Sequence, residues 1–153
     1  MRKRVSLFIV LILVCAAMLS ACSTTASKSA TFDVDTGDSI KISVNAKEGY
    51  DLTTEVPFAI TKDGDTVLNG SFIYAEYYDV YRQAIGEDAN ATLIEEGSKD
   101  GNDYFFYTFE GSAGTESDYV MMVGGSQTAI LMGSLAETSE VQAAFEAMTV
   151  SLE

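Results

Sequence analysis

The sequence predicts an α+β fold, in which an antiparallel sheet of about 6–8 strands is covered by two helices. Three observations support this prediction. Segments in which apolar and polar residues alternate, as in strands, lie on both sides of a segment whose apolar residues repeat at helical spacing. A second segment with helical spacing lies near the C-terminus. The links between consecutive strands are short enough for antiparallel pairing.

Strand and turn signals dominate the first half of the folded part. Residues 39–46 (SIKISVNA) alternate apolar and polar side chains and predict a strand with one buried face. Residues 56–75 contain two such runs, separated by Asp63-Gly64. Because Asp and Gly tolerate a positive φ angle, this dipeptide predicts a β-hairpin.

The spacing of apolar residues changes at residues 73–86. The residues that recur there at helical spacing are Tyr74, Tyr78, Tyr81 and Ile85. Gly86 follows them and commonly ends a helix at such a position. We therefore expect an amphipathic helix over residues 75–85.

Four strands are predicted in the second half, at residues 91–98, 104–111, 119–125 and 128–135. The last two contain uninterrupted apolar runs, which indicate a sheet covered on both faces. A second helix over residues 139–148 supplies a cover, and Ser139 with Gln142 forms a capping box. Its apolar stripe consists of Val141, Ala144, Phe145 and Met148. A short strand at residues 149–152 is expected to complete the sheet.

The order of these elements resembles that of the PsbP-like fold. This fold is shared by an extrinsic photosystem II subunit, a nuclear import cofactor that binds the small GTPase Ran, and many bacterial lipoproteins. The resemblance covers residues 32–153 and rests on element order and helix placement. It implies an α/β/α sandwich that serves mainly for binding rather than catalysis, and it assigns a function to no individual residue.

The N-terminus has the layout of a secretory signal. Arg2, Lys3 and Arg4 precede an apolar run of 13 residues, shorter than the roughly 20 needed to span a bilayer. The run ends at Leu19-Ser20-Ala21-Cys22, which resembles the lipobox of bacterial lipoproteins. An ordinary signal peptide, cut after small residues at positions 17–19, and an uncleaved membrane anchor are the alternatives.

The lipobox implies cleavage before Cys22 and acylation of its sulfur by a diglyceride, with palmitate-like chains. We therefore expect three parts: a signal peptide at residues 1–21, a lipidated Cys22 with a flexible tether at residues 22–31, and one α+β domain at residues 32–153. The domain is predicted to be anchored to the cell membrane on its extracytoplasmic side. Cys15 leaves with the signal peptide, so the mature chain forms no intrachain disulfide.

The charge of the predicted mature chain excludes nucleic acid as a partner. This chain keeps all 23 acidic residues but only six of the nine basic residues, so its formal charge is −17. Phosphate binding needs clustered Lys and Arg, which are absent here. Direct docking of the domain on an anionic leaflet is unfavourable for the same reason.

The inventory of side chains assigns no catalytic residue. Histidine is absent and the one mature thiol is predicted to be acylated, which excludes Cys/His catalysis and zinc sites built on those residues. Glu95 and Glu96 are neighbours on a predicted strand, so they point to opposite faces. Lys99 lies in a turn without a serine motif beside it.

Calcium is the alternative that the acidic turns raise. The weak candidate ligands are Asp33, Asp35 and Asp38 in one turn and Asp63 and Asp65 in another. A third acidic turn contains Asp100, Asn102 and Asp103. None of these turns fits the EF-hand loop, and aspartate is also a common turn former. No cofactor is therefore assigned, with Ca²⁺ as the open alternative.

Tyrosines concentrate on the first predicted helix. Core packing accounts for Tyr74, Tyr78 and Tyr81, whereas Tyr77 lies off the apolar stripe and is a weak candidate for a binding face. The sequence thus predicts a membrane-anchored extracytoplasmic lipoprotein with a non-enzymatic binding or adaptor domain, whose partner is an envelope protein. A Ca²⁺-dependent module is the alternative. A carboxylate-based hydrolase is third and would require a concave pocket with two inward carboxylates.

Overall fold

The computed structural model describes residues 27–153 and confirms the α+β class. The first five strands are β1 (Ser27–Asp33), β2 (Ser39–Asn45), β3 (Tyr50–Leu52), β4 (Phe58–Lys62) and β5 (Asp65–Tyr74). The later strands are β6 (Ala91–Lys99), β7 (Asn102–Gly111), β8 (Gly114–Met122), β9 (Thr128–Ser134) and β10 (Met148–Leu152). The helices are the short 3-10 helix η1 (Ala46–Glu48), α2 (Tyr77–Glu87) and α3 (Thr138–Ala147).

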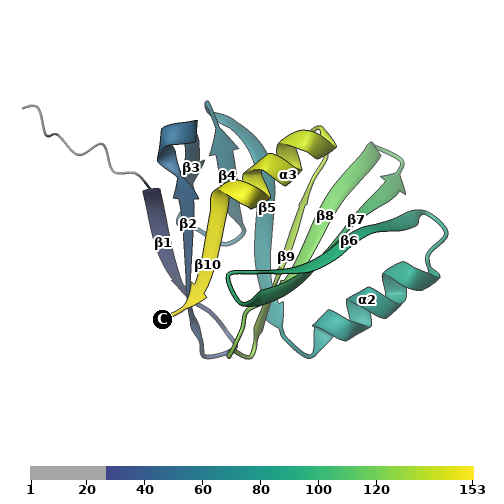
Figure 1. Ribbon diagram of the computed structural model, residues 1–153, viewed down its shortest axis with the longest axis horizontal. Coiled ribbons are helices and arrows are strands. Elements are labelled where there is room, and N and C mark those ends of the chain that lie inside the picture. The colour runs from purple at the N-terminus through teal and green to yellow at the C-terminus, as the bar shows by residue number, and fades with distance from the viewer. Residues whose placement is uncertain (1–26) are drawn as a thin grey trace, which may run out of the picture.

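The strands form two sheets, in which all pairs are antiparallel (Figure 1). The large sheet has seven strands in the order β3-β4-β5-β9-β8-β7-β6, and the small sheet has three in the order β1-β2-β10. The last strand was expected to complete the main sheet. It pairs instead with β2, because α3 carries the chain across to the small sheet.

Adjacent residues of the central strands pack on opposite faces of the large sheet. On one face, α3 and the small sheet enclose the larger core, in which the rings of Tyr119 and Phe145 stack with centroids 3.8 Å apart. On the other face, α2 covers a smaller core formed by Ile85, Phe105 and Val120. The prediction of a sheet covered on both faces is therefore confirmed for β8 and β9.

The turn of the first predicted hairpin has the expected geometry. Asp63 and Gly64 join β4 to β5 with φ angles of 53° and 97°. Two consecutive positive φ angles are typical of the type I′ turn, which suits the twist of a two-stranded hairpin.

The first helix begins later than the sequence predicts. Tyr74 was expected on the apolar stripe of the helix, but it is the last residue of β5, pairs with Thr128 of β9 and is 47% exposed. The amide of Ala75 also donates to the carbonyl of Gln127, so backbone bonds hold this stretch in the sheet. Gly86 does not end the helix, which continues to Glu87.

The capping box predicted for the second helix is wrong. Helix α3 begins at Thr138, one residue before Ser139, and its N-cap Glu137 makes no side-chain capping bond. A hydrogen bond of 2.9 Å between Thr138 Oγ1 and Ser117 Oγ of β8 explains the shift, since it ties the first helical residue to the sheet.

The predicted tether at residues 22–31 is partly wrong as well. Residues 27–31 belong to β1, which pairs with β2 from Ser27 opposite Asn45 onwards. Lys28 forms an ion pair with Asp51, and Ser29 bonds to Ser43 at 2.7 Å, so cross-strand contacts hold this segment in the small sheet. Cys22 and residues 1–21 lie outside the described residues.

No helix within residues 27–153 is long and apolar enough to cross a membrane.

Candidate functional site

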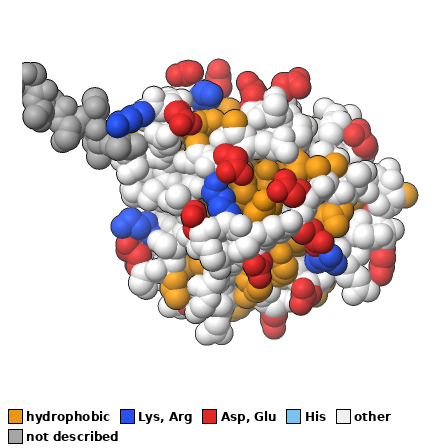
Figure 2. Space-filling model, in the orientation of Figure 1, with side chains coloured by type: hydrophobic (Ala, Val, Ile, Leu, Met, Phe, Trp, Pro, Cys, Tyr) orange, Lys and Arg blue, Asp and Glu red, His pale blue; other side chains and the backbone are white. Residues whose placement is uncertain are grey.

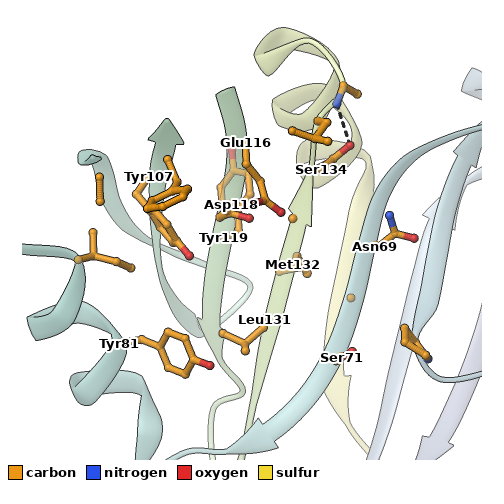
Figure 3. Close-up of a pocket in the computed structure, with 18 of the residues that line it drawn as sticks. Asn69, Ser71, Tyr81, Tyr107, Glu116, Asp118, Tyr119, Leu131, Met132 and Ser134 are labelled. Carbon is orange, nitrogen blue, oxygen red and sulfur yellow. Dashed lines mark hydrogen bonds between the residues drawn. The ribbon is translucent and has the colours of Figure 1, made fainter. Parts of the chain in front are cut away.

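A pocket of about 1010 Å³ lies on the face of the large sheet that α2 covers only in part (Figure 3). Helix α2 packs over β6 and β8 and leaves the neighbouring surface of β9 and β5 open. The pocket is therefore bounded by α2 on one side and floored by the sheet. Its position follows from the short length of α2, 11 residues, against a sheet of seven strands.

The floor is built by one row of residues that face each other across four strands. Asn69 of β5 lies opposite Gly133 of β9, Gly133 lies opposite Asp118 of β8, and Asp118 lies opposite Tyr107 of β7. Since alternate residues of a strand share a face, Glu116 lies on the same side as Asp118. Both carboxylates line the pocket.

Asp118 is the unusual member of this row. It is 9% exposed and is the only buried acidic residue within residues 27–153. No hydrogen bond or ion pair joins its carboxylate to another residue in that part of the chain. Burial raises the pKa of Asp118 to about 7, and the nearby charge of Glu116 adds to the effect.

Gly133 provides the space that the two carboxylates occupy. A Cβ atom at this position would lie 2.1 Å from Oδ1 of Asp118 and 3.2 Å from Oε1 of Glu116. Both oxygens thus lie over the same point of β9, beside each other (Figure 3). A side chain here would displace Asp118, so the pair depends on a glycine in the facing strand.

Aromatic and apolar side chains form the walls. Tyr81 of α2 and Tyr107 of β7 stand on one side, and Leu131 and Leu135 of β9 and the loop after it on the other. Burial, followed by the charges of Asp118 and Glu116, raises the pKa of Tyr107 above its ordinary value, so its phenol stays protonated at neutral pH. The hydroxyl is therefore available as a hydrogen-bond donor.

The pocket is negatively charged. Two carboxylates line it, a third acid, Asp88, lies at its edge, and no Lys or Arg is among its described lining residues. The visible face of the molecule likewise carries many acidic and few basic side chains (Figure 2). This arrangement can hold a cation or a group that donates hydrogen bonds, and it disfavours phosphates and carboxylates.

The acidic turns singled out as calcium candidates have structural contacts instead. Asp38 Oδ2 accepts bonds from Thr128 Oγ1 at 2.7 Å and from the Gln127 amide at 2.8 Å, which joins the β1–β2 turn to the start of β9. These bonds, that of Thr128 first, lower the pKa of Asp38. Asp33 accepts a bond of 2.5 Å from Ser39 Oγ. Asp35 lies exposed in the same turn.

Asp63 and Asp65 flank Gly64 in the β4–β5 hairpin, in a different turn from Asp33, Asp35 and Asp38. Within residues 27–153, no three acidic or thiol side chains come together as a metal site would require.

The other residues considered from the sequence lie outside the pocket. Tyr77 is 46% exposed and is not among the residues that line the pocket. Glu95 accepts a bond of 2.8 Å from the hydroxyl of Tyr104, whereas Glu96 pairs with Arg82 of α2, so the two glutamates do point to opposite faces. Lys99 bonds to Glu146 at 3.0 Å.

Sequence reasoning missed Glu116, Asp118 and the pocket itself. One signal was present: Asp118 directly precedes an apolar run in β8, and an apolar run in β9 is followed by Gly133. A charge and a glycine at the ends of two buried strands indicate a close approach, but only the register shows that they face each other.

Comparison with known proteins identifies no relative: no protein-family model matches the chain, and no curated protein is significantly similar to it.

Proposed function

We propose that this protein is a lipid-anchored extracytoplasmic binding protein without catalytic activity, and that its ligand occupies the pocket between α2 and the large sheet. The buried, unpartnered carboxylate of Asp118 is the observation that carries the proposal. A buried charge without a partner destabilises a fold. Such groups concentrate at sites where they meet a ligand.

The anchor is proposed from Leu19-Ser20-Ala21-Cys22. Because β1 begins at Ser27, residues 22–26 would be the whole link to the lipid. Five extended residues reach at most about 17 Å, so the domain would stay close to the bilayer surface. The resemblance in element order to the PsbP-like fold, which is used mainly for binding, supports the same proposal.

One experiment tests the pocket in cells. A photoreactive phenylalanine replaces Leu135, which lines the pocket and is 58% exposed; the matched control replaces Val80, which is equally exposed on α2 but does not line it. We expect a defined envelope component to crosslink at position 135 and not at position 80. The crosslink should disappear in Ser71→Phe, which fills the pocket floor. A crosslink that survives Ser71→Phe would contradict the proposal.

The anchor has a separate test. Cys22→Ala should move the protein from the membrane fraction to the soluble fraction, and labelling with a palmitate analogue should be lost. A variant that stays bound to the membrane would disprove lipid anchoring and leave the pocket proposal standing.

A carboxylate-based hydrolase is the second candidate, because Glu116 and Asp118 lie together in a concave pocket. We place it second because both side chains come from one strand and lie side by side, whereas a hydrolase of this kind places a scissile bond between its carboxylates. Release of nitrophenol from nitrophenyl glycosides and esters tests it. Turnover that Asp118→Asn and Glu116→Gln each abolish would establish the enzyme.

A further inference from the structure

We propose that the pocket recognises an organic cation, a primary ammonium or guanidinium group on an apolar stem, and that Asp118 and Glu116 bind the charged head. This inference rests on the proposed function, since it names the ligand chemistry of the same pocket. It is argued from the position of the carboxylates, the nature of the walls and the charges around them.

The carboxylates are placed to share one cationic head. Their oxygens lie 2.1 Å and 3.2 Å from the same point above Gly133, so a group in front of β9 can contact both. An ammonium or guanidinium group donates several hydrogen bonds and suits two acceptors side by side. The Asn69 amide in the same row provides a further acceptor through its carbonyl oxygen.

The walls suit the rest of such a ligand. Tyr81 and Tyr107 provide aromatic rings beside the carboxylates, and a cation gains energy near an aromatic face when it leaves water. Leu131 and Leu135 provide apolar contact for a stem. A volume of about 1010 Å³ holds a ligand of the size of an aromatic amine or a long side chain with its flanking groups.

Other ligand classes fit the pocket less well. An anion would meet two carboxylates and no basic side chain among the described lining residues. A neutral ligand would leave Asp118 buried and without a counter-charge once it closes the pocket to water. Only a cation neutralises the pair, so the charge of the site selects the ligand.

The cation can be a free amine or the Lys or Arg side chain of an envelope protein, and the chemistry of the pocket is the same for both. Calorimetry on the full-length protein in phosphatidylcholine nanodiscs separates these sources. The free probes are 2-phenylethylamine, its neutral analogue 2-phenylethanol and the anion phenylacetate. The peptide probe is acetyl-Ala-Phe-Lys-Ala-amide, compared with the same peptide in which norleucine replaces lysine.

We expect the amine to bind at least about tenfold more tightly than the alcohol, and phenylacetate not to bind, because charge-assisted hydrogen bonds contribute about 1.5–3 kcal/mol each. Asp118→Asn should weaken binding of the amine about tenfold or more and leave the alcohol unchanged. Asp100→Asn is the matched control: it removes the same charge from an exposed turn where φ is 54°, which asparagine tolerates, and it should behave as the wild type.

The lysine peptide binding about tenfold or more tighter than the free amine would assign the cation to a protein partner, and the reverse would assign it to a small molecule. Equal affinities for amine and alcohol, tighter binding of phenylacetate, or an amine affinity that Asp118→Asn leaves intact would overturn the inference. Absence of binding by every cationic probe would overturn it as well, while the crosslink at Leu135 would still decide the proposed function.

Discussion

Replacing Asp118 with asparagine should stabilise the protein above neutral pH. The pKa of Asp118 is about 7 in the fold against 3.8 for a free side chain, a difference of roughly three units. At about 1.36 kcal/mol per unit, ionisation of the buried carboxyl costs at most about 4 kcal/mol. The pocket is open to solvent, which screens the charge, so we expect about 2 kcal/mol.

The sign follows from the raised pKa. Between about pH 4 and pH 7 the folded protein holds a proton on Asp118 that the unfolded chain has lost, so the wild type becomes less stable as pH rises through this window. Asparagine does not titrate. The stability difference in favour of Asp118→Asn should therefore grow from less than about 1 kcal/mol near pH 4.5 to its full value above pH 7.

The titratable groups that face Asp118 are common to both proteins and cancel in the comparison. They are Glu116 on β8, Tyr107 on β7, and Tyr81 and Asp88 on α2; β5 and β9 present none to the pocket within the described residues. Urea unfolding at about pH 4.5, 6 and 8, followed by circular dichroism, measures the difference. A variant less stable than the wild type at pH 8, or a difference that does not change with pH, would refute the reasoning.

Further substitutions and a titration test the geometry around this site and the core, with urea unfolding as the measure of stability. Affinity for 2-phenylethylamine should rise about tenfold or more from about pH 5.5 to about pH 8 as Asp118 ionises, and a flat profile would count against a role for this carboxylate. Gly133→Ala should cost about 1–3 kcal/mol and weaken amine binding, because its Cβ would lie 2.1 Å from Asp118 Oδ1; unchanged binding would mean that Asp118 moves without consequence. Gly70→Ala should cost about 1–3 kcal/mol or more, because its Cβ would lie 2.1 Å from the ring of the fully buried Phe58, while amine affinity in the folded fraction should persist. Thr128→Val should cost about 1–2 kcal/mol by removing the buried hydroxyl that donates to Asp38, and a neutral result would show that the β1–β2 turn holds without it.

Local signals were sufficient for the fold class and for most elements. Alternation in residues 39–46 predicts β2, and Asp63-Gly64 predicts the hairpin that the structure contains, because both depend on neighbours in the sequence. The errors occur where distant residues decide. Tyr74 has helical spacing but pairs with Thr128, 54 positions away, and Ser27 has little to bury but pairs with Asn45.

The candidate site depends still more on distant contacts. That Glu116 and Asp118 share a face follows from strand alternation alone. That they lie over a glycine requires the register of β8 against β9, and that the face is open requires the path of α2. A reading of the sequence therefore finds acidic residues in turns, where they bond to nearby groups such as Thr128, and passes over the one acid that is buried without a partner.

The cost of burying Asp118 and the proposed affinity for cations have the same origin. In the free protein the ionised carboxylate lacks the hydrogen bonds and counter-charge that water or a basic side chain would supply. A cation that enters the pocket supplies both, so it recovers stability that Asp118→Asn would recover without a ligand. The stabilisation of the wild type by a bound amine should thus be largest above pH 7, where the carboxylate is ionised, and small in Asp118→Asn at every pH. A ligand that stabilised both proteins equally would show that the buried charge contributes nothing to recognition.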